Sequence, residues 1–411
     1  MNSALIGLVG TPKGLIAERL LIGRDSMINI QTVLIISNPA NFKSLSYFYL
    51  VLIGIMAFLL STFVKKIMVA VNSLTNNADR SWLKVISNYK YPEISRSMWQ
   101  LINTFIPYVI LWVAMYYCLS ISYWLVLLLT IPASGFLIRL FIIFHDCGHG
   151  SFLPSKRAND IIGILIGILA FTPYFRWHHA HMIHHRTAGN LDKRGTGDVW
   201  TLTVEEYRKL SKSRQRAYRI YRHPLVMFGI GAALVFFLSN RFTRKHFGLK
   251  ERVSVYLTNL ALLLFASVMS FLIGLKAFLL IQMPVMYFAA TAGVYLFYVQ
   301  HQFPDVQWVR DKEWDYKTIA LEGSSFLKLP KILQFFSGNI GFHHIHHLSS
   351  KIPNYKLEKC HRENELFKDI KPVTFAESFR CLKLRLWYEE KQRLVSFKEL
   401  RLALKNRLNM A

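Results

Sequence analysis

Histidines gather in three short stretches of this chain, and this clustering is the first sign of chemistry. Eleven of the fifteen histidines lie within residues 145–149, 178–185 and 343–347. Imidazole is the commonest metal-binding side chain in proteins, and it accepts zinc, copper, iron and nickel. The clustering therefore suggests a metal site built from histidines.

The spacing inside each stretch sharpens this hypothesis. Residues three and four apart share one face of a helix, so each stretch, if helical, can aim its imidazoles at one point. The histidines with this spacing are His145, His149, His181, His184, His185, His343, His346 and His347. Eight imidazoles are too many for one tetrahedral zinc ion. We expect two metal ions between facing helices, and the ligand type leaves the metal open.

Several neighbouring polar residues are candidates for supporting the site. His178, His179 and His344 fall outside the helical spacing, and we expect them to form structural or metal-orienting hydrogen bonds. Asp146 and Asp198 could each hold the far nitrogen of a metal-bound imidazole, as carboxylates often do. A helix cap or a surface turn explains either aspartate equally well.

Two long apolar regions separate the three stretches. Residues 105–144 break near Ser120–Ser122, and residues 255–299 break at 274–276. Each region can hold two membrane spans of about twenty residues, so each hairpin returns the chain to the side it left. All three histidine stretches then lie on the same side. We predict an all-α integral membrane protein: two transmembrane helical hairpins with a cytoplasmic histidine-rich cap holding a di-metal site.

The charge distribution agrees with this topology. The net charge is +26, and residues 156–222 hold thirteen Lys or Arg against five Asp or Glu. Positive charge collects in the cytoplasmic loops of membrane proteins, so we expect the active site on the cytoplasmic face of the plasma membrane. The chain has no visible DNA-reading helix or RNA motif, which disfavours nucleic-acid binding. The four cysteines form no CxxC pair, which fits a reducing compartment.

The order of the motifs resembles the membrane fatty acid desaturases. HxxxH, HxxHH and HxxHH occur in turn around two apolar hairpins, and residues 145–152, 195–200 and 339–347 are similar to bacterial acyl-lipid desaturases. The resemblance covers roughly residues 98–355. It implies two iron ions, with His301 at the end of the fourth span as a ninth ligand. Some members carry an asparagine one turn before that histidine; Phe297 stands here, so that role is not transferred.

The resemblance also implies a reaction. It implies O2-dependent desaturation of a fatty acyl chain, giving a cis double bond and water, with a role in unsaturated fatty acid biosynthesis and membrane fluidity. O2 is the co-substrate, and a ferredoxin or flavodoxin is the external electron donor. The flanking sequences favour a chain carried on a membrane glycerolipid. Trp177 and Trp200 could line the acyl tunnel, although anchoring at the membrane interface explains them equally well.

The predicted domain organisation follows from these features. Residues 1–90 form an extension of unclear role with a possible extra span at 47–64, residues 91–370 form the desaturase domain, and residues 371–411 form a basic helical tail. We expect a charged surface helix over 384–408 within that tail. Residues 161–174 are apolar but too short to span, and are expected to form an interfacial helix or a helix under the bundle. Residues 225–238 are equally short and are expected at the membrane interface.

Other functions fit the sequence less well. The same site could hydroxylate or ketolate a lipid or carotenoid, because both outcomes follow removal of a C–H hydrogen. A metal transporter would place its ligands within the spans, near the membrane midplane. A haem carrier needs only paired axial ligands, and eight clustered imidazoles exceed that number.

Overall fold

The computed structural model of the chain describes residues 61–62, 65–66 and 81–410. Apart from two residues, the possible span at 47–64 lies outside the described residues, as does most of the N-terminal extension. The description that follows concerns residues 81–410, which begin with the short helix α2 (Ser81–Ser87).

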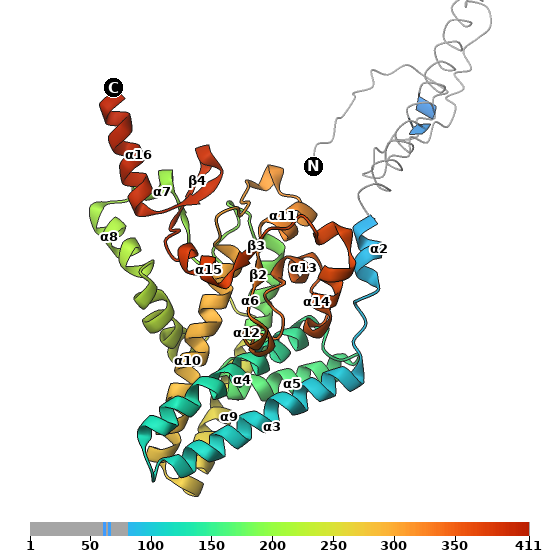
Figure 1. Ribbon diagram of the computed structural model, residues 1–411, viewed down its shortest axis with the longest axis vertical. Helices are drawn as coiled ribbons and strands as arrows, with labels where there is room; N and C mark the ends of the chain where they lie inside the picture. Colours follow the sequence, from blue (N-terminus) through green and yellow to red (C-terminus); the bar gives the residue numbers. More distant parts are fainter. Residues whose placement is uncertain (1–60, 63–64, 67–80, 411) are drawn as a thin grey trace, which may run out of the picture. The chain divides into compact units, whose positions relative to one another are not determined.

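Two helical hairpins form the base of the molecule (Figure 1). The first consists of α3 (Ile94–Cys118) and α4 (Tyr123–His149), and the second of α9 (Leu249–Ile273) and α10 (Leu275–His301). Within residues 81–410 these four helices are each long and apolar enough to cross a membrane by themselves. The turns fall where the sequence predicts them. Ser122 accepts a hydrogen bond from Trp124 N in one, and Gly274 has φ 86° in the other.

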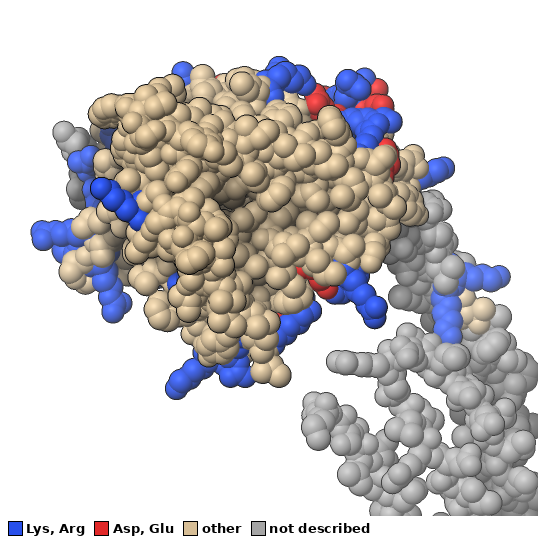
Figure 2. Space-filling model, turned by 90° about the horizontal axis from the view of Figure 1, so that it is seen from below, with Lys and Arg blue, Asp and Glu red and all other residues tan. Residues whose placement is uncertain are grey.

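The outer surface of the hairpins is apolar. Phe271 is 90% exposed and Trp124 is 79% exposed, which is costly in water and expected in lipid. Seen from below the view of Figure 1, the face that the hairpins present is almost free of charged residues, which gather around its rim (Figure 2). These exposed apolar surfaces agree with a protein embedded in a membrane.

The segment between the hairpins packs against helices of both of them. It contains two helices that meet at 103°, α5 (Lys156–Leu169) and α6 (Tyr174–Thr187). The chain turns sharply there, with Phe171 at φ 52° followed by Pro173 as the residue before α6. The remaining elements of this segment are β1 (Leu202–Thr203), α7 (Val204–Lys209), α8 (Lys212–Tyr221), the π-helical turns η1 (Leu225–Gly231) and η2 (Leu234–Leu238), and the short η3 (Ser239–Arg241).

The chain after α10 covers the ends of the hairpins that carry His149 and His301 (Figure 1). Its elements are η4 (Asp311–Glu313), α11 (Tyr316–Glu322), β2 (Phe326–Lys328), α12 (Lys331–Phe336), α13 (His343–Leu348), α14 (Asn354–Glu363), η5 (Glu365–Phe367), β3 (Pro372–Thr374) and α15 (Phe375–Cys381). Strand β2 pairs in parallel with β3. Helix α13 contacts α11, α14 and β2, which hold it above the hairpins in Figure 1.

The predicted surface helix over 384–408 is wrong in its first half. The structure has β4 (Leu386–Tyr388), η6 (Glu389–Lys391) and β5 (Arg393–Val395) there, and only then α16 (Phe397–Met410). Strand β4 is central in a small sheet, parallel to β1 and antiparallel to β5. Its three side chains are all buried, and Trp387 stacks on Trp308. Three consecutive apolar residues buried on both faces suit a central strand better than an exposed helix.

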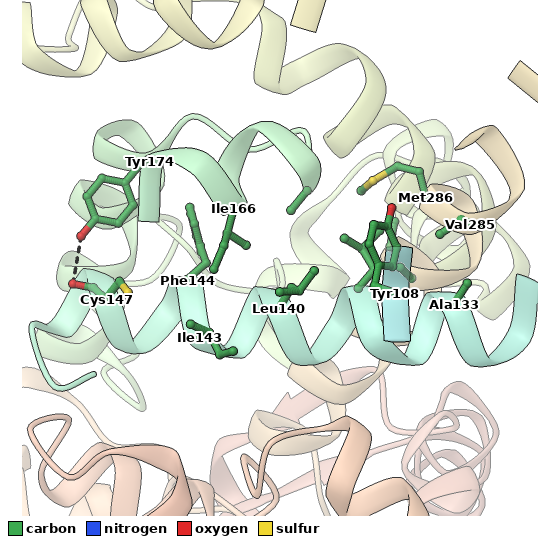
Figure 3. Packing of buried hydrophobic residues seen from close by; sticks show 14 of the residues in the cluster. Tyr108, Ala133, Leu140, Ile143, Phe144, Cys147, Ile166, Tyr174, Val285 and Met286 are labelled. Carbon is green, nitrogen blue, oxygen red and sulfur yellow. Dashed lines mark hydrogen bonds between the residues drawn. The ribbon is translucent and has the colours of Figure 1, made fainter. Parts of the chain in front are cut away.

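A continuous apolar core joins α4 to its neighbours (Figure 3). Near the histidine end of α4, Phe144 packs edge-on against Tyr174 of α6, whose hydroxyl donates to Cys147 O at 2.9 Å. At the other end, Tyr108, Val285 and Met286 gather beside Ala133 in Figure 3. This core fixes the direction of α4 and so the position of its last turns.

Candidate metal centre

Helix α4 supplies the first pair of histidines in its last turns. His145 and His149 are one helical turn apart, and the helix ends at Gly150, whose φ of 61° is the left-handed conformation common after helix ends. Gly150 N and Ser151 N donate to the free carbonyls of Cys147 and Asp146, and Lys351 Nζ donates to His149 O at 2.6 Å. These hydrogen bonds hold the C-terminal end of α4 in place.

Helices α6, α10 and α13 bring the other histidines to the same place. Helix α6 carries His181, His184 and His185, α10 ends on His301, and α13 carries His343, His346 and His347. Within residues 81–410, these seven residues and the pair on α4 form two groups in which the candidate ligand atoms lie within 4.8 Å of one another. One group is His145, His149, His181, His185 and His346; the other is His184, His301, His343 and His347.

The two groups cut across the three stretches of sequence. We expected each stretch to aim its imidazoles at one point, but α6 gives His181 and His185 to the five-histidine group and His184 to the four-histidine group. Helix α13 is divided in the same way. Side chains three and four positions along a helix diverge slightly around its axis, so one short helix serves two neighbouring centres.

Hydrogen bonds to Nδ1 indicate which ring nitrogen faces the site in two of these histidines. His184 Nδ1 donates to Asp198 Oδ1 at 2.6 Å, and His301 Nδ1 faces Gly323 O at 3.4 Å. In the neutral tautomers that match these bonds both Nε2 atoms carry lone pairs, and the two atoms lie 3.1 Å apart. A cation between them would accept both lone pairs. This arrangement fits a metal ion.

The five-histidine group is equally crowded. Nε2 of His181 lies 3.0 Å from Nε2 of His149 and 3.1 Å from Nε2 of His185. Nε2 of His346 lies 3.0 Å from Nε2 of His185. One neutral imidazole carries a single N–H, so the rings cannot all satisfy one another by hydrogen bonding, and here too a bound metal ion would.

Burial keeps these rings in the form that binds metals. Loss of water, followed by the effect of neighbouring imidazoles, lowers the pKa of His181, His185 and His346 well below the usual histidine value. The same causes lower the pKa of His343 and His347. These histidines are therefore neutral at physiological pH, and a neutral imidazole has a lone pair to give to a metal.

Both predicted aspartates bond to a histidine, one in each group. Asp198 accepts from His184 as described, and Asp146 Oδ1 accepts from His145 Nδ1 at 3.1 Å. The other oxygen of Asp146 accepts from Asn354 N at 2.7 Å and from Asn354 Nδ2 at 2.8 Å. Asp146 is buried, so these donors replace the water that its charge has lost.

The other three predicted histidines lie away from the two groups. His178 stacks on Tyr174, and Nδ1 of the exposed His179 lies 3.6 Å from Glu251 Oε1. His344 is fully buried, and its Nε2 lies 3.3 Å from His361 Nδ1. Burial lowers the pKa of His344 to about 3, so it is a neutral part of the core beneath α13.

An apolar cavity of about 270 Å³ opens beside the histidines. His145, His181 and His343 line it, together with apolar residues of α4, α10 and η2. Trp177 also lines it and stacks on His181 with ring centroids 4.4 Å apart. Trp200 is not part of this wall: it is half exposed and packs edge-on against Tyr218.

A second, much smaller cavity lies on the other side of Phe297. It has a volume of about 30 Å³ and is lined by polar residues that include Arg194, Asp198 and His301. This volume holds only one or two water-sized molecules. Phe297 lines both cavities, so its ring forms part of the wall between the polar space and the apolar one.

Sequence reasoning missed the residues that support Asp146. Asn354 lies 208 positions from it along the chain, and Gln100 of α3 donates in turn to Asn354 Oδ1 at 2.7 Å. Neither residue stands in a recognisable pattern. Only the packing of α3, α4 and the N-terminus of α14 brings them together.

Comparison with known proteins points the same way as this geometry. A family model described as fatty acid desaturase matches residues 122–374. The chain is 49% identical over 318 residues to a protein of Bacillus subtilis (strain 168) named "Fatty acid desaturase", covering 77% of this chain and 90% of that protein. It is 28% identical over 255 residues to the "sn-1 oleoyl-lipid 12-desaturase" of Anabaena variabilis, covering 59% and 69% of the two chains. It is 27% identical over 259 residues to the "sn-1 acyl-lipid omega-3 desaturase (ferredoxin)" of Synechocystis sp. (strain ATCC 27184 / PCC 6803 / Kazusa), covering 60% and 67%. The two groups of histidines beside an apolar cavity thus belong to an oxidoreductase, and the chain is a member of the fatty acid desaturase family.

Proposed function

We propose that this desaturase inserts a cis double bond into an acyl chain of a membrane glycerolipid, using O2 and two bound iron ions. The single observation that carries the proposal is the contact between site and cavity: His145, His181 and His343 form part of the wall of an apolar space. A saturated carbon pair lying there would be next to both groups of imidazoles. The names of the cyanobacterial relatives support an acyl-lipid substrate.

The five-histidine group would hold one iron ion and the four-histidine group the other. When bound, such a pair of metal ions supplies the oxidising power that no amino-acid side chain has against an alkyl C–H bond. The chain's own contribution is positioning. Asp146 and Asp198 hold His145 and His184 in the tautomer with Nε2 free, and the apolar walls exclude water from the acyl chain.

We propose a ferredoxin or a flavodoxin as the electron donor. One cyanobacterial relative carries "ferredoxin" in its name, and the excess of basic residues in this chain suits an acidic partner. The basic, histidine-bearing side of the hairpins would face the cytoplasm, where both the donor and the anionic leaflet of the plasma membrane are available.

The test is the fatty-acid profile of a host that expresses the chain, with double bonds located by derivatisation and mass spectrometry. His184→Ala removes one proposed ligand, and His179→Ala is the matched control because His179 is exposed and outside both groups. We expect a new unsaturated acid with the wild type and His179→Ala, and none with His184→Ala. A new oxygenated lipid would indicate a hydroxylase instead. No new lipid from iron-loaded, membrane-inserted protein supplied with a working donor would refute the proposal.

A further inference from the structure

Gly293 is an unusual glycine in the middle of α10. Glycine destabilises a helix interior relative to alanine, so it usually has a packing reason there. A Cβ on Gly135 or Gly163 would lie 2.7 Å or 2.3 Å from an aromatic carbon of a neighbouring helix. A Cβ on Gly293 would meet no neighbouring atom within 4 Å. Close helix contact therefore does not explain Gly293.

The missing side chain of Gly293 faces the apolar cavity, whose wall it helps to form. Gly293 precedes His301 by about 12 Å along α10, at 1.5 Å of rise per residue. Met286, Ala289 and Ala290 line the same cavity further along α10 from the histidines. Gly293 thus lies between the metal centre and the deeper part of the cavity.

The deep part of the cavity ends on buried apolar side chains. Leu137 and Met286 line it and are only 1% and 2% exposed. Tyr108, Val285 and Ala133 pack closely around them, as Figure 3 shows for the labelled residues. A lipid headgroup buried here would lose its hydration without gaining partners. The methyl end of an acyl chain is the part of a lipid that suits this floor.

We propose that Gly293 determines the length of acyl chain that the desaturase accepts, because its missing side chain leaves open the passage to the floor of the cavity. The inference rests on the proposed acyl-lipid function. A larger residue at position 293 would shorten the space beyond the metal centre while leaving the histidines and their partners untouched. Chains with a long methyl-terminal segment would then be excluded first.

The experiment measures product chain lengths for a graded series, Gly293→Ala, Gly293→Val and Gly293→Leu. A host without its own desaturase is fed myristic, palmitic and stearic acids, and each monounsaturated product is measured relative to its saturated precursor. We expect the palmitoyl-to-stearoyl product ratio to rise with side-chain size, by roughly tenfold or more for Gly293→Leu, as a filled apolar pocket rejects extra methylenes.

The matched control is Ala292→Leu, which enlarges the next residue of the same helix, outside the cavity wall. Iron content and thermal stability of the purified variants are measured alongside. We expect unchanged iron content in the series and a wild-type product ratio for Ala292→Leu. An unchanged ratio across the variants that retain iron, or an equal shift from Ala292→Leu, would overturn the proposal. Gly293→Ala adds one carbon into open space, so the series does not depend on the leucine variant folding. Failure of the wild type to form any unsaturated acid would instead count against the proposed function.

Discussion

In each of the two histidine groups, a carboxylate accepts a hydrogen bond from one histidine. Asp146 bonds to His145 of the five-histidine group, and Asp198 bonds to His184 of the four-histidine group. Such partners fix the ring orientation and raise the basicity of the metal-binding nitrogen. The two aspartates differ in exposure: the side chain of Asp198 is 19% exposed and that of Asp146 is 1% exposed. Asp198 is therefore the better position for mutation, because a change to the more exposed side chain disturbs the protein core less.

We predict that Asp198→Asn weakens iron binding by about 10- to 100-fold, the usual effect of losing such a partner. The neutral amide still fits the loop, but its oxygen accepts the proton of His184 Nδ1 more weakly than the carboxylate does. Iron retained by purified protein during titration with a chelator measures the effect. Asp305→Asn, which changes an exposed carboxylate outside both groups, is the control. Equal iron retention in the two variants would show that Asp198 only shapes its loop.

Part of this residue-level picture could be predicted from the sequence. Helical spacing identifies eight histidines because the geometry of a helix turn is a local rule. His301 stands alone in the sequence, and only the family resemblance indicates it. The bond between Asn354 and Asp146 could not be predicted, since it depends on two segments 208 positions apart.

At the scale of elements, the bend between α5 and α6 controls how α6 presents its histidines. Gly163 of α5 allows the ring of Tyr174 to lie against the helix backbone, and Tyr174 donates to Cys147 O of α4. Three elements therefore meet at this contact. The sequence predicts both hairpins because the thickness of the bilayer fixes the length of a span. It does not predict the 103° bend, which arises from packing.

We predict that Gly163→Ala lowers the stability of the protein by about 1–3 kcal/mol, the usual cost of overfilling a tightly packed contact. The added carbon would lie 2.3 Å from the Tyr174 ring, so α5 and α6 must move apart. Thermal unfolding in detergent measures the loss, and iron content shows whether α6 shifts. Gly293→Ala adds the same methyl group without a clash and is the matched control. Equal melting temperatures would contradict the packing argument.

At the scale of the whole molecule, the charged residues are unevenly distributed over the surface. The face of the hairpins seen in Figure 2 is almost uncharged at its centre, while the chain as a whole carries a net charge of +26. Part of this excess lies in residues 156–222, which follow the histidine-bearing end of α4 and hold thirteen Lys or Arg against five Asp or Glu. Such a field attracts acidic partners over distances longer than a direct contact.

We predict that the rate of desaturation at low concentrations of an acidic ferredoxin falls as salt is added. The Debye length shortens to about 10 Å at 0.1 M salt, which weakens the long-range attraction. Turnover of purified enzyme at increasing ionic strength measures this effect. At saturating ferredoxin the salt dependence should largely disappear, because encounter no longer limits the rate. A rate independent of salt at low ferredoxin would mean that contacts other than charge guide docking.

The division of α13 between the two groups has a consequence for how the enzyme is made. His346 belongs to one group, and His343 and His347 belong to the other. All three are synthesised after both hairpins, so the five-histidine group is complete only after residue 346 and the four-histidine group only after residue 347. Loading of the two proposed iron ions would therefore be a late event in biogenesis, because a nascent or truncated chain lacks a complete set of the proposed ligands.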